Sequence, residues 1–254
     1  MTVPEFLFLL AAGVGAGLTG SIAGLASLVS YPALLATGLP PVTANVTNTV
    51  ALVLNAVGSV SASRPELRGQ GRRLRPLLLA AVAGGSTGAV LLLLTPPDAF
   101  ERIVPWLIAG ASVAILVQRP PRELAAEGAR HATVPDSRWS ALGTFVVTVY
   151  GGYFGAAAGV LLLALYLLST GEGLPRGNAM KNVVLGVANG VAAVGFALLA
   201  DVAWAAALPL AAGFFLGGRL GPRVVRRAPQ TALRTLIALA GLGLAVHLGL
   251  QAYL

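Results

Sequence analysis

The chain has 254 residues, of which 56% are hydrophobic and 10% are charged, and its mean hydropathy is +0.82. A soluble domain carries about 25% charged residues, so this composition excludes a soluble globular protein. The net charge of +8 would suit a nucleic-acid-binding protein. Because the arginines cluster in the gaps between apolar runs, membrane topology accounts for them better, and we expect no nucleic-acid partner.

Apolar runs of roughly 20 residues, the length that a helix needs to cross a bilayer, recur from end to end. They lack the two-residue alternation of a membrane β-barrel. We therefore expect an all-α, multi-pass protein of the plasma membrane, with one transmembrane domain over residues 1–254. No basic residue precedes the run that begins at Phe6, so this run is interpreted as a membrane segment and not as a cleaved signal.

The first half of the chain, residues 1–117, contains four apolar segments. The first, Glu5–Thr37, is long and rich in glycine, and the cluster Gly17–Gly24 interrupts it. The other three cover residues 39–61, 76–94 and 100–117. A basic loop separates the second segment from the third and carries Arg64, Arg68, Arg72, Arg73 and Arg75.

Residues 118–138 are polar and charged, which predicts a cytoplasmic linker. The pattern then restarts in the second half, residues 139–254, with the long glycine-rich stretch Trp139–Thr170 and its cluster Gly151–Gly159. Three further apolar segments cover residues 174–200, 204–221 and 231–252, and the basic cluster before the last of them contains Arg223, Arg226 and Arg227.

The two halves match each other when the chain is shifted so that Pro76 falls on Pro209, which we call the repeat shift. The same shift matches Gly84-Gly85-x-x-Gly88 with Gly217-Gly218-x-x-Gly221 and, with one residue of slack, Asn48 and Asn55 with Asn182 and Asn189. These matches predict a tandem repeat, and membrane transporters built from repeats place their binding site at the interface between them.

The arginine distribution predicts that the two repeats have inverted topology. Cytoplasmic loops carry the excess of arginine and lysine. If every segment crossed once, either the Arg64–Arg75 loop or the Arg223–Arg227 cluster would lie outside. Glu5–Thr37 and Trp139–Thr170 are each roughly 30 residues long, against about 20 needed to span. If each folds back at its glycines, all basic loops face the cytoplasm and both termini lie outside, leaving three spanning helices per repeat.

Lys181 is the only lysine of the chain and lies near the start of an apolar segment. One interpretation is a side chain that snorkels to the membrane surface. The other is a counter-charge for an anion, since a charge within a span costs roughly 2.5–3.5 kcal/mol on insertion scales. The recurrence of the pattern at Thr47-Asn48 favours the second interpretation.

We expect one anion site between the halves, to which the broken helices add free N–H groups. The expected substrate-binding residues are Lys181, Asn182, Asn48, Thr47, Asn55, Asn189, Ser27 and Ser21, with the backbone of Gly24, Gly155 and Gly159. For the asparagines and serines, hydrogen bonding between helices is the alternative role. The Gly84 and Gly217 motifs are expected to be packing motifs of the small-xxx-small kind.

The order of these motifs resembles the TauE/SafE sulfite exporter family over the whole chain. The resemblance rests on the fold-back ending near Pro32, Ala44–Asn48, the arginine-rich loop, Gly84–Gly88, Gly152–Gly159 and Ala179–Asn182. Many members carry consecutive glycines in the first fold-back, whereas this chain has Ala23-Gly24-Leu25-Ala26-Ser27, so the site there is expected to be reshaped. The resemblance implies export of a small sulfur-containing anion such as sulfite, sulfoacetate or another organosulfonate.

Two other functions stay open at this point: a membrane scaffold without a transported substrate, and a cation-coupled importer of a small anion. The importer should show acidic residues within its spans, but Glu5, Asp98 and Asp201 lie at segment ends. His131 and His247 are too few for a metal cluster, so we expect no catalytic residue, metal or cofactor. The oligomeric state is not determined, and a homodimer is one option.

Overall fold

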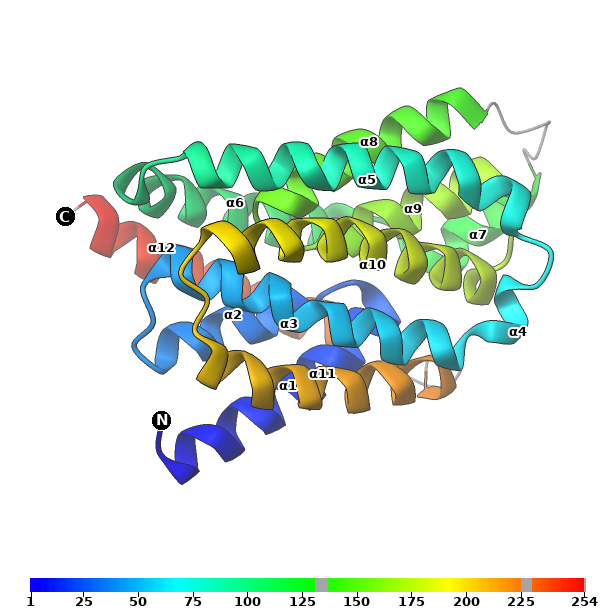
Figure 1. Cartoon of the computed structure of the whole chain (residues 1–254). Coiled ribbons are helices and arrows are strands. Elements are labelled where there is room, and N and C mark those ends of the chain that lie inside the picture. The colour runs from blue at the N-terminus through cyan, green and yellow to red at the C-terminus, as the bar shows by residue number, and fades with distance from the viewer. Residues whose placement is uncertain (131–136, 225–229, 254) are drawn as a thin grey trace.

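The computed structural model describes residues 1–130, 137–224 and 230–253, and every secondary-structure element in these ranges is a helix (Figure 1). The helices are, in chain order, α1 (Val3–Ala23), α2 (Ala26–Ala36), α3 (Pro41–Ala62), α4 (Arg64–Leu67), α5 (Gly71–Leu94), α6 (Pro97–Val117), α7 (Pro121–Arg130), α8 (Ser137–Tyr153), α9 (Ala158–Thr170), α10 (Leu174–Leu199), α11 (Trp204–Val224) and α12 (Gln230–Tyr253). The all-α class expected from the sequence is confirmed.

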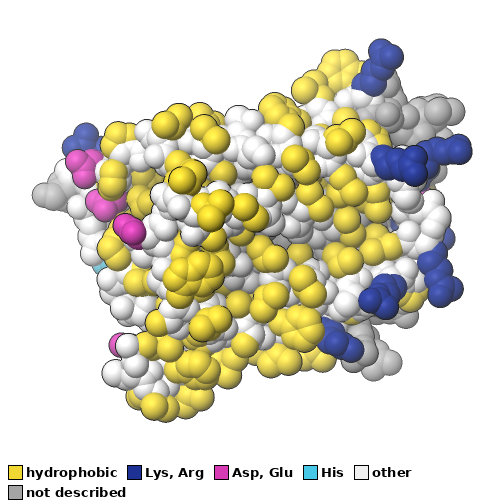
Figure 2. All heavy atoms as spheres, viewed as in Figure 1, with side chains coloured by type: hydrophobic (Ala, Val, Ile, Leu, Met, Phe, Trp, Pro, Cys, Tyr) yellow, Lys and Arg dark blue, Asp and Glu magenta, His cyan; other side chains and the backbone are white. Residues whose placement is uncertain are grey.

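Five of the described helical segments are long and apolar enough to cross a membrane, namely α1, α5, α6, α10 and residues 234–253 of α12. Hydrophobic side chains cover the face of the molecule between its two ends (Figure 2). Leu79, Trp106 and Leu198 are between 69% and 77% exposed. A bilayer removes such a surface from water, so the chain is a multi-pass membrane protein.

Prolines mark the starts of several helices. Pro41, Pro97 and Pro175 lie at the first or second position of α3, α6 and α10. The first N–H groups of a helix have no partner within it, so a proline there loses no hydrogen bond. Pro41 and Pro175 also lie near the expected beginnings of their segments, whereas α6 begins at Pro97, before the expected start at Phe100.

Neither long glycine-rich stretch is one continuous helix, as the sequence predicted. Gly24, with φ of +78°, divides the first stretch into α1 and α2. Residues 154–157 divide the second into α8 and α9, and Gly155 and Ala157 there have φ of +77° and +60°. A left-handed residue cannot continue a right-handed helix. The first break is shorter than expected, because Gly17 still belongs to α1.

Each broken pair starts and ends at the same end of the molecule. In Figure 1, α1 leaves the end that holds both termini and α2 returns to it before α3 crosses. Helices α8 and α9 do the same from the opposite end, and α9 returns to where α10 begins. With 11 and 13 residues, α2 and α9 are too short to span a hydrocarbon core of about 30 Å.

The two ends of the molecule differ in charge. The loop before α5, the region of α7 and the end of α11 lie at one end, where arginine side chains gather (Figures 1 and 2). The termini and the loops before α6 and α11, near Asp98 and Asp201, lie at the other end. Arg226 and Arg227 are outside the described residues. This separation of charge is what the inverted topology requires.

Helices of the two halves pack on each other reciprocally. Helix α1 packs on α11, α8 packs on α5, and α3 and α10 cross between these pairs. A methyl group at Gly217 would collide with the carbonyl oxygen of Val14, and one at Gly88 with that of Val149. The two glycine motifs therefore serve helix packing, which is the role expected for them.

The linker expected over residues 118–138 contains a short helix that the sequence analysis did not predict. Helix α7 packs on α9, with Leu124 buried and Gly128 against the backbone of Leu167. The polar composition concealed it, since one short apolar contact is enough to hold ten residues against an existing helix.

Candidate functional site

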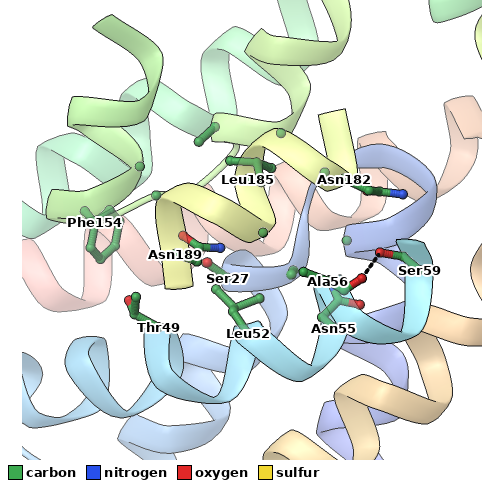
Figure 3. Close-up of a pocket in the computed structure, with 18 residues that line it drawn as sticks. Ser27, Thr49, Leu52, Asn55, Ala56, Ser59, Phe154, Asn182, Leu185 and Asn189 are labelled. Carbon is green, nitrogen blue, oxygen red and sulfur yellow. Dashed lines mark hydrogen bonds between the residues drawn. The ribbon is translucent and has the colours of Figure 1, made fainter. Parts of the chain in front are cut away.

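A cavity of about 40 Å³ lies where the two helix breaks meet α3 and α10 (Figure 3). A Cβ atom at Gly24 would collide with the backbone of Gly159, so the two breaks touch directly. The cavity is lined by both halves of the chain: Gly20, Gly24, Ala26, Ser27, Thr49, Leu52, Asn55, Ala56 and Ser59 from the first, and Gly151, Phe154, Gly155, Ala158, Gly159, Asn182, Leu185, Gly186 and Asn189 from the second. A water molecule needs roughly 10–15 Å³ of such volume, so the cavity has room for a few waters or one small ion.

The polar lining of the cavity consists of amides and hydroxyls. Figure 3 shows one row of these side chains along α3 and another along α10. The polar side chains are Ser27, Thr49, Asn55, Ser59, Asn182 and Asn189, and no described lining residue is acidic or basic. Neutral groups of this kind both donate and accept hydrogen bonds. A preference of the cavity for an anion or for a cation must therefore come from the backbone or from residues that lie behind the lining.

The structure brings together most of the residues that the sequence nominated for a site. The lining includes Asn55, Asn182, Asn189, Ser27, Gly24, Gly155 and Gly159. It does not include Lys181, Asn48, Thr47 and Ser21.

Two of the residues outside the lining hold helices together. Asn48 accepts a hydrogen bond from Ser30 Oγ at 2.6 Å and donates one to Ser27 Oγ at 3.1 Å, which ties α3 to α2. Thr47 Oγ1 accepts a hydrogen bond at 3.0 Å from the backbone N–H of Ala203, just before α11. Asn48 therefore has the interhelical role that the sequence left open for it, and Thr47 joins α3 to the segment that precedes α11.

Lys181 is 0% exposed and so does not snorkel to the membrane surface. Its Nζ donates to the carbonyl oxygen of Gly20 at 2.9 Å and to that of Ser21 at 3.4 Å, while the Ser21 hydroxyl turns back to the α1 backbone. Within the described residues no carboxylate forms an ion pair with it. The C-terminal carbonyls of α1 carry partial negative charge and are the groups that face this ammonium.

Two half-helices begin at the cavity. Ala26 and Ser27 in the first turn of α2, and Ala158 and Gly159 in the first turn of α9, belong to its lining. Neither helix has a side-chain cap. The first N–H groups of a helix lack partners in a preceding turn, and its N-terminus carries partial positive charge. In α9 the N–H groups of Ala158 and Val160 donate to the carbonyl oxygens of Gly155 and Ala157, which leaves the N–H of Gly159 among the first three. Together, the two N-termini favour an anion in the cavity.

Two amide groups in the cavity wall are buried without a hydrogen-bond partner. They are Asn182 Nδ2, on a residue that is 5% exposed, and Asn55 Oδ1, on a residue that is 9% exposed. A buried polar group left unpaired costs about 1–3 kcal/mol. Both atoms therefore call for a ligand or water, and Nδ2 is a donor that suits an oxyanion.

The sequence analysis missed Thr49, Ser59 and Phe154 as lining residues. The repeat shift places Thr49 on Asn182, so applying it without slack would have identified this threonine. The same strict shift pairs Asn48 with Lys181. No comparable signal marks Ser59, a small polar residue in an apolar run.

Phe154 connects the cavity to a cluster of aromatic rings. Its ring lies edge-on to Tyr31 with centroids 5.2 Å apart, and 6.1 Å from the ring of Phe100. Tyr31 also lines a second cavity of about 240 Å³, together with Glu101 and Gln251. The Tyr31–Phe154 pair therefore separates the central cavity from a larger one toward the acidic end.

A small polar cavity at two helix breaks, inside a multi-pass helical protein, is the architecture of a membrane transporter. The described residues hold no group of three His, Cys, Asp or Glu side chains that could bind a metal ion. Comparison with known families then identifies the chain: the family model of the sulfite exporter TauE/SafE matches residues 9–248. The protein belongs to the TauE/SafE sulfite exporter family, as the resemblance of its motifs predicted.

Relatives in three bacteria are named as membrane transporters and not as enzymes. A probable membrane transporter protein of Sinorhizobium, ORF9, is 26% identical over 245 residues, which cover 95% of this chain and 91% of that protein. The probable membrane transporter YfcA of Escherichia coli K12 is 28% identical over 227 residues, or 88% of this chain and 82% of YfcA. One from Haemophilus influenzae is 27% identical over 231 residues, covering 89% and 88%. No solved structure matches the chain.

Proposed function

We propose that this protein exports a small sulfur-containing anion, either sulfite or an organosulfonate such as sulfoacetate, through the central cavity between two inverted repeats. The family supports transport and the sulfite role. The volume of about 40 Å³ favours sulfite, because an organosulfonate would need the cavity to widen.

One observation carries the proposal of an anion. The N-termini of α2 and α9 meet at a cavity without charged side chains, beside the unpartnered donor Asn182 Nδ2. The first turn of α2, the Gly159 N–H of α9 and the Asn182 amide supply N–H groups to oxygen atoms, while the absence of acidic residues from the described lining avoids repulsion. The binding set is Asn182, Asn55, Asn189 and Ser27 with the backbone of the breaks, and Lys181 lies behind this set, in contact with Gly20.

Inverted repeats explain why the site has this composition. The repeat shift places Gly24 on Ala157, and both residues have positive φ at the junction of a broken pair. When one half is superimposed on the other, the break in the first half falls on the break in the second, at the centre of the membrane. The cavity is then the meeting point of equivalent elements, which is where transporters with repeats bind their substrates.

Export needs no coupled ion in this scheme. An inside-negative potential favours an anion leaving the cell by about 2.3 kcal/mol per charge per 100 mV. No acidic side chain among the described lining residues is placed to relay a proton or bind a cation, so nothing in the site favours the cation-coupled importer. Nor does any observation favour the scaffold.

Flux measured in proteoliposomes tests the function. We expect purified protein to release sulfite from loaded vesicles, and to do so faster when the compartment that corresponds to the cytoplasm is made negative. Sulfoacetate, sulfate and a small carboxylate form the comparison panel. Absence of flux and of binding for every anion of the panel, with protein correctly inserted, would exclude the proposal.

A further inference from the structure

The two broken helices also present their C-terminal ends to the cavity. Helix α1 ends at Ala23 and contributes Gly20 to the lining, and α8 ends at Tyr153 and contributes Gly151. Carbonyl groups at a helix C-terminus carry partial negative charge. The partial negative charge of these C-terminal ends repels the anion that the N-termini of α2 and α9 attract. An anion site therefore requires a group that offsets this partial negative charge.

Two asparagines bind the C-terminal ends reciprocally. Asn178 Nδ2 donates to the carbonyl oxygen of Ser21 at 2.8 Å, and Asn45 Nδ2 donates to that of Tyr153 at 2.8 Å. The repeat shift places Asn45 on Asn178, and each reaches from its own half to the broken helix of the other. At this turn of α3 and α10 the two halves are equivalent.

One turn later the equivalence ends, at Asn48 and Lys181, which the repeat shift also pairs. Asn48 makes its hydrogen bonds to serines of α2 in its own half. Lys181 crosses to the other half, where its Nζ meets the carbonyl oxygens of Gly20 and Ser21. Between these two positions, only the α1 end receives the amine of a lysine side chain.

We propose that Lys181 is a positioning residue of the anion site, whose ammonium offsets the C-terminal end of α1 without touching the anion. This inference rests on the proposed function. Gly20 provides the connection, since its carbonyl oxygen binds Nζ while the residue itself lines the cavity. Asn182 follows Lys181 directly and lines the cavity with its unpartnered Nδ2. The contact with α1 thus also fixes the turn of α10 that carries this donor.

Two variants that remove the charge test the role through sulfite binding to the purified full-length protein. We expect Lys181→Met and Lys181→Gln to bind sulfite about tenfold to thirtyfold more weakly, the effect of losing a charge at a partly buried helix end. Glutamine keeps a hydrogen-bond donor for the Gly20 carbonyl but has no charge. A similar loss of sulfite affinity in both variants would therefore show that the charge of Lys181 is what matters. Full affinity in Lys181→Gln would assign the role to the hydrogen bond and overturn the electrostatic proposal.

Thermal melting with and without sulfite separates this role from simple stabilisation. A ligand that binds only the folded state raises the melting temperature by an amount that grows with the logarithm of its concentration relative to its Kd. We expect Lys181→Met to reduce the sulfite-induced rise more than it reduces the melting temperature of the protein alone. The opposite pattern would make Lys181 a structural residue. Arg68→Met, at an exposed arginine of the basic end, is the matched control and should bind sulfite as the wild type does.

Amine modification tests whether Lys181 acts without contact. Because it is the only lysine, reductive methylation followed by mass spectrometry reports on it directly. Lys181 should stay unmodified in the folded, anion-free protein and react after denaturation. Ready modification of the folded protein would place the amine on the cavity and overturn the proposal.

The two proposals fail separately. Wild-type protein that binds no sulfite or organosulfonate overturns the proposed function. Wild-type protein that binds sulfite, together with unchanged affinity in Lys181→Met, overturns only the role of Lys181.

Discussion

Buried asparagines of this protein fall into two kinds at the residue scale. Asn48 uses both sides of its amide, accepting from Ser30 and donating to Ser27. Asn182 leaves its donor Nδ2 without a partner in the cavity wall. The first kind stabilises helix contacts, and the second is available to a ligand, although the two residues have the same chemistry and similar burial.

Asn182→Ala should therefore reduce mainly sulfite binding, whereas Asn48→Ala should reduce mainly the stability of the protein. We expect Asn182→Ala to weaken sulfite binding about tenfold, the loss of one hydrogen bond to a charged group, while the melting temperature stays near that of the wild type. Asn48→Ala should lower the melting temperature, because it removes the two hydrogen bonds that join α3 to Ser27 and Ser30 of α2, although Ser30 keeps the carbonyl oxygen of Ala26 as a partner. Sulfite titration and thermal melting of both variants check this. Equal effects on both quantities would refute the division.

At the element scale, the decisive feature is the contact between the two helix breaks. The backbone of Gly24, at the junction of α1 and α2, touches the backbone of Gly159 in the first turn of α9, without a side chain between them. This close approach places the two N-termini at one cavity, whereas side chains at the contact would push them apart.

Gly159→Ala should impair folding or transport, because the new Cβ would lie 2.5 Å from the Cα atom of Gly24. Overpacking of this kind costs about 1–3 kcal/mol. Gly190→Ala in α10 is the control, since nothing lies within 4 Å of a Cβ there. Yield, melting temperature and sulfite flux of the two variants are the measurements. A Gly159→Ala protein that equals Gly190→Ala in all three would show that the breaks do not need this contact.

The loop between α9 and α10 is joined to α5 by Glu172. Its carboxylate accepts hydrogen bonds from Gln70, Arg73 and Arg176 at 3.2, 2.6 and 3.0 Å. Partial burial acts to raise the pKa of this carboxyl group, but the hydrogen bonds from Arg176 and Gln70 and the two arginine charges outweigh it and hold the pKa below its ordinary value. The interaction thus favours the ionised form.

This lowered pKa predicts a loss of stability at acidic pH. A carboxyl group with a depressed pKa in the folded state stabilises fully above its unfolded value of about 4.3, and the contribution disappears as the pH falls through the folded value. We expect Glu172→Gln to lower the melting temperature at neutral pH and to match the wild type at strongly acidic pH. Melting curves across this range check it, and a difference between the proteins that does not change with pH would contradict it.

At the scale of the whole molecule, charge is divided between two ends while both termini share one of them (Figures 1 and 2). From the positive-inside rule we predict that the basic end lies in the cytoplasm and the termini lie outside. The fold-back of α1–α2 and α8–α9 makes this orientation consistent for both halves.

Cysteine accessibility tests the orientation, because the chain has no cysteine of its own. Asp201→Cys, at the acidic end, should react with a membrane-impermeant thiol reagent in intact cells, whereas Arg68→Cys should react only after permeabilisation. Neither position is buried, so differences in labelling report on the side of the membrane. Labelling of Arg68→Cys from outside would reverse or refute the inverted model.

The sequence by itself determined the membrane class, the approximate positions of the apolar segments, the two breaks and part of the cavity lining. Composition and the length of apolar runs are sufficient for the first two, because the bilayer sets both. Asn55, Asn182 and Asn189 could be predicted as site residues because polar side chains are costly inside a membrane span. The seven-residue spacing also puts Asn182 and Asn189, like Asn48 and Asn55, on one helix face. Only the tertiary structure decided which polar groups face the cavity and which face each other. Asn48 and Asn182 look alike in sequence, and Lys181 meets the carbonyl of Gly20, 161 residues away. Such pairings depend on how distant helices pack, and local sequence carries no record of the partner that packing brings.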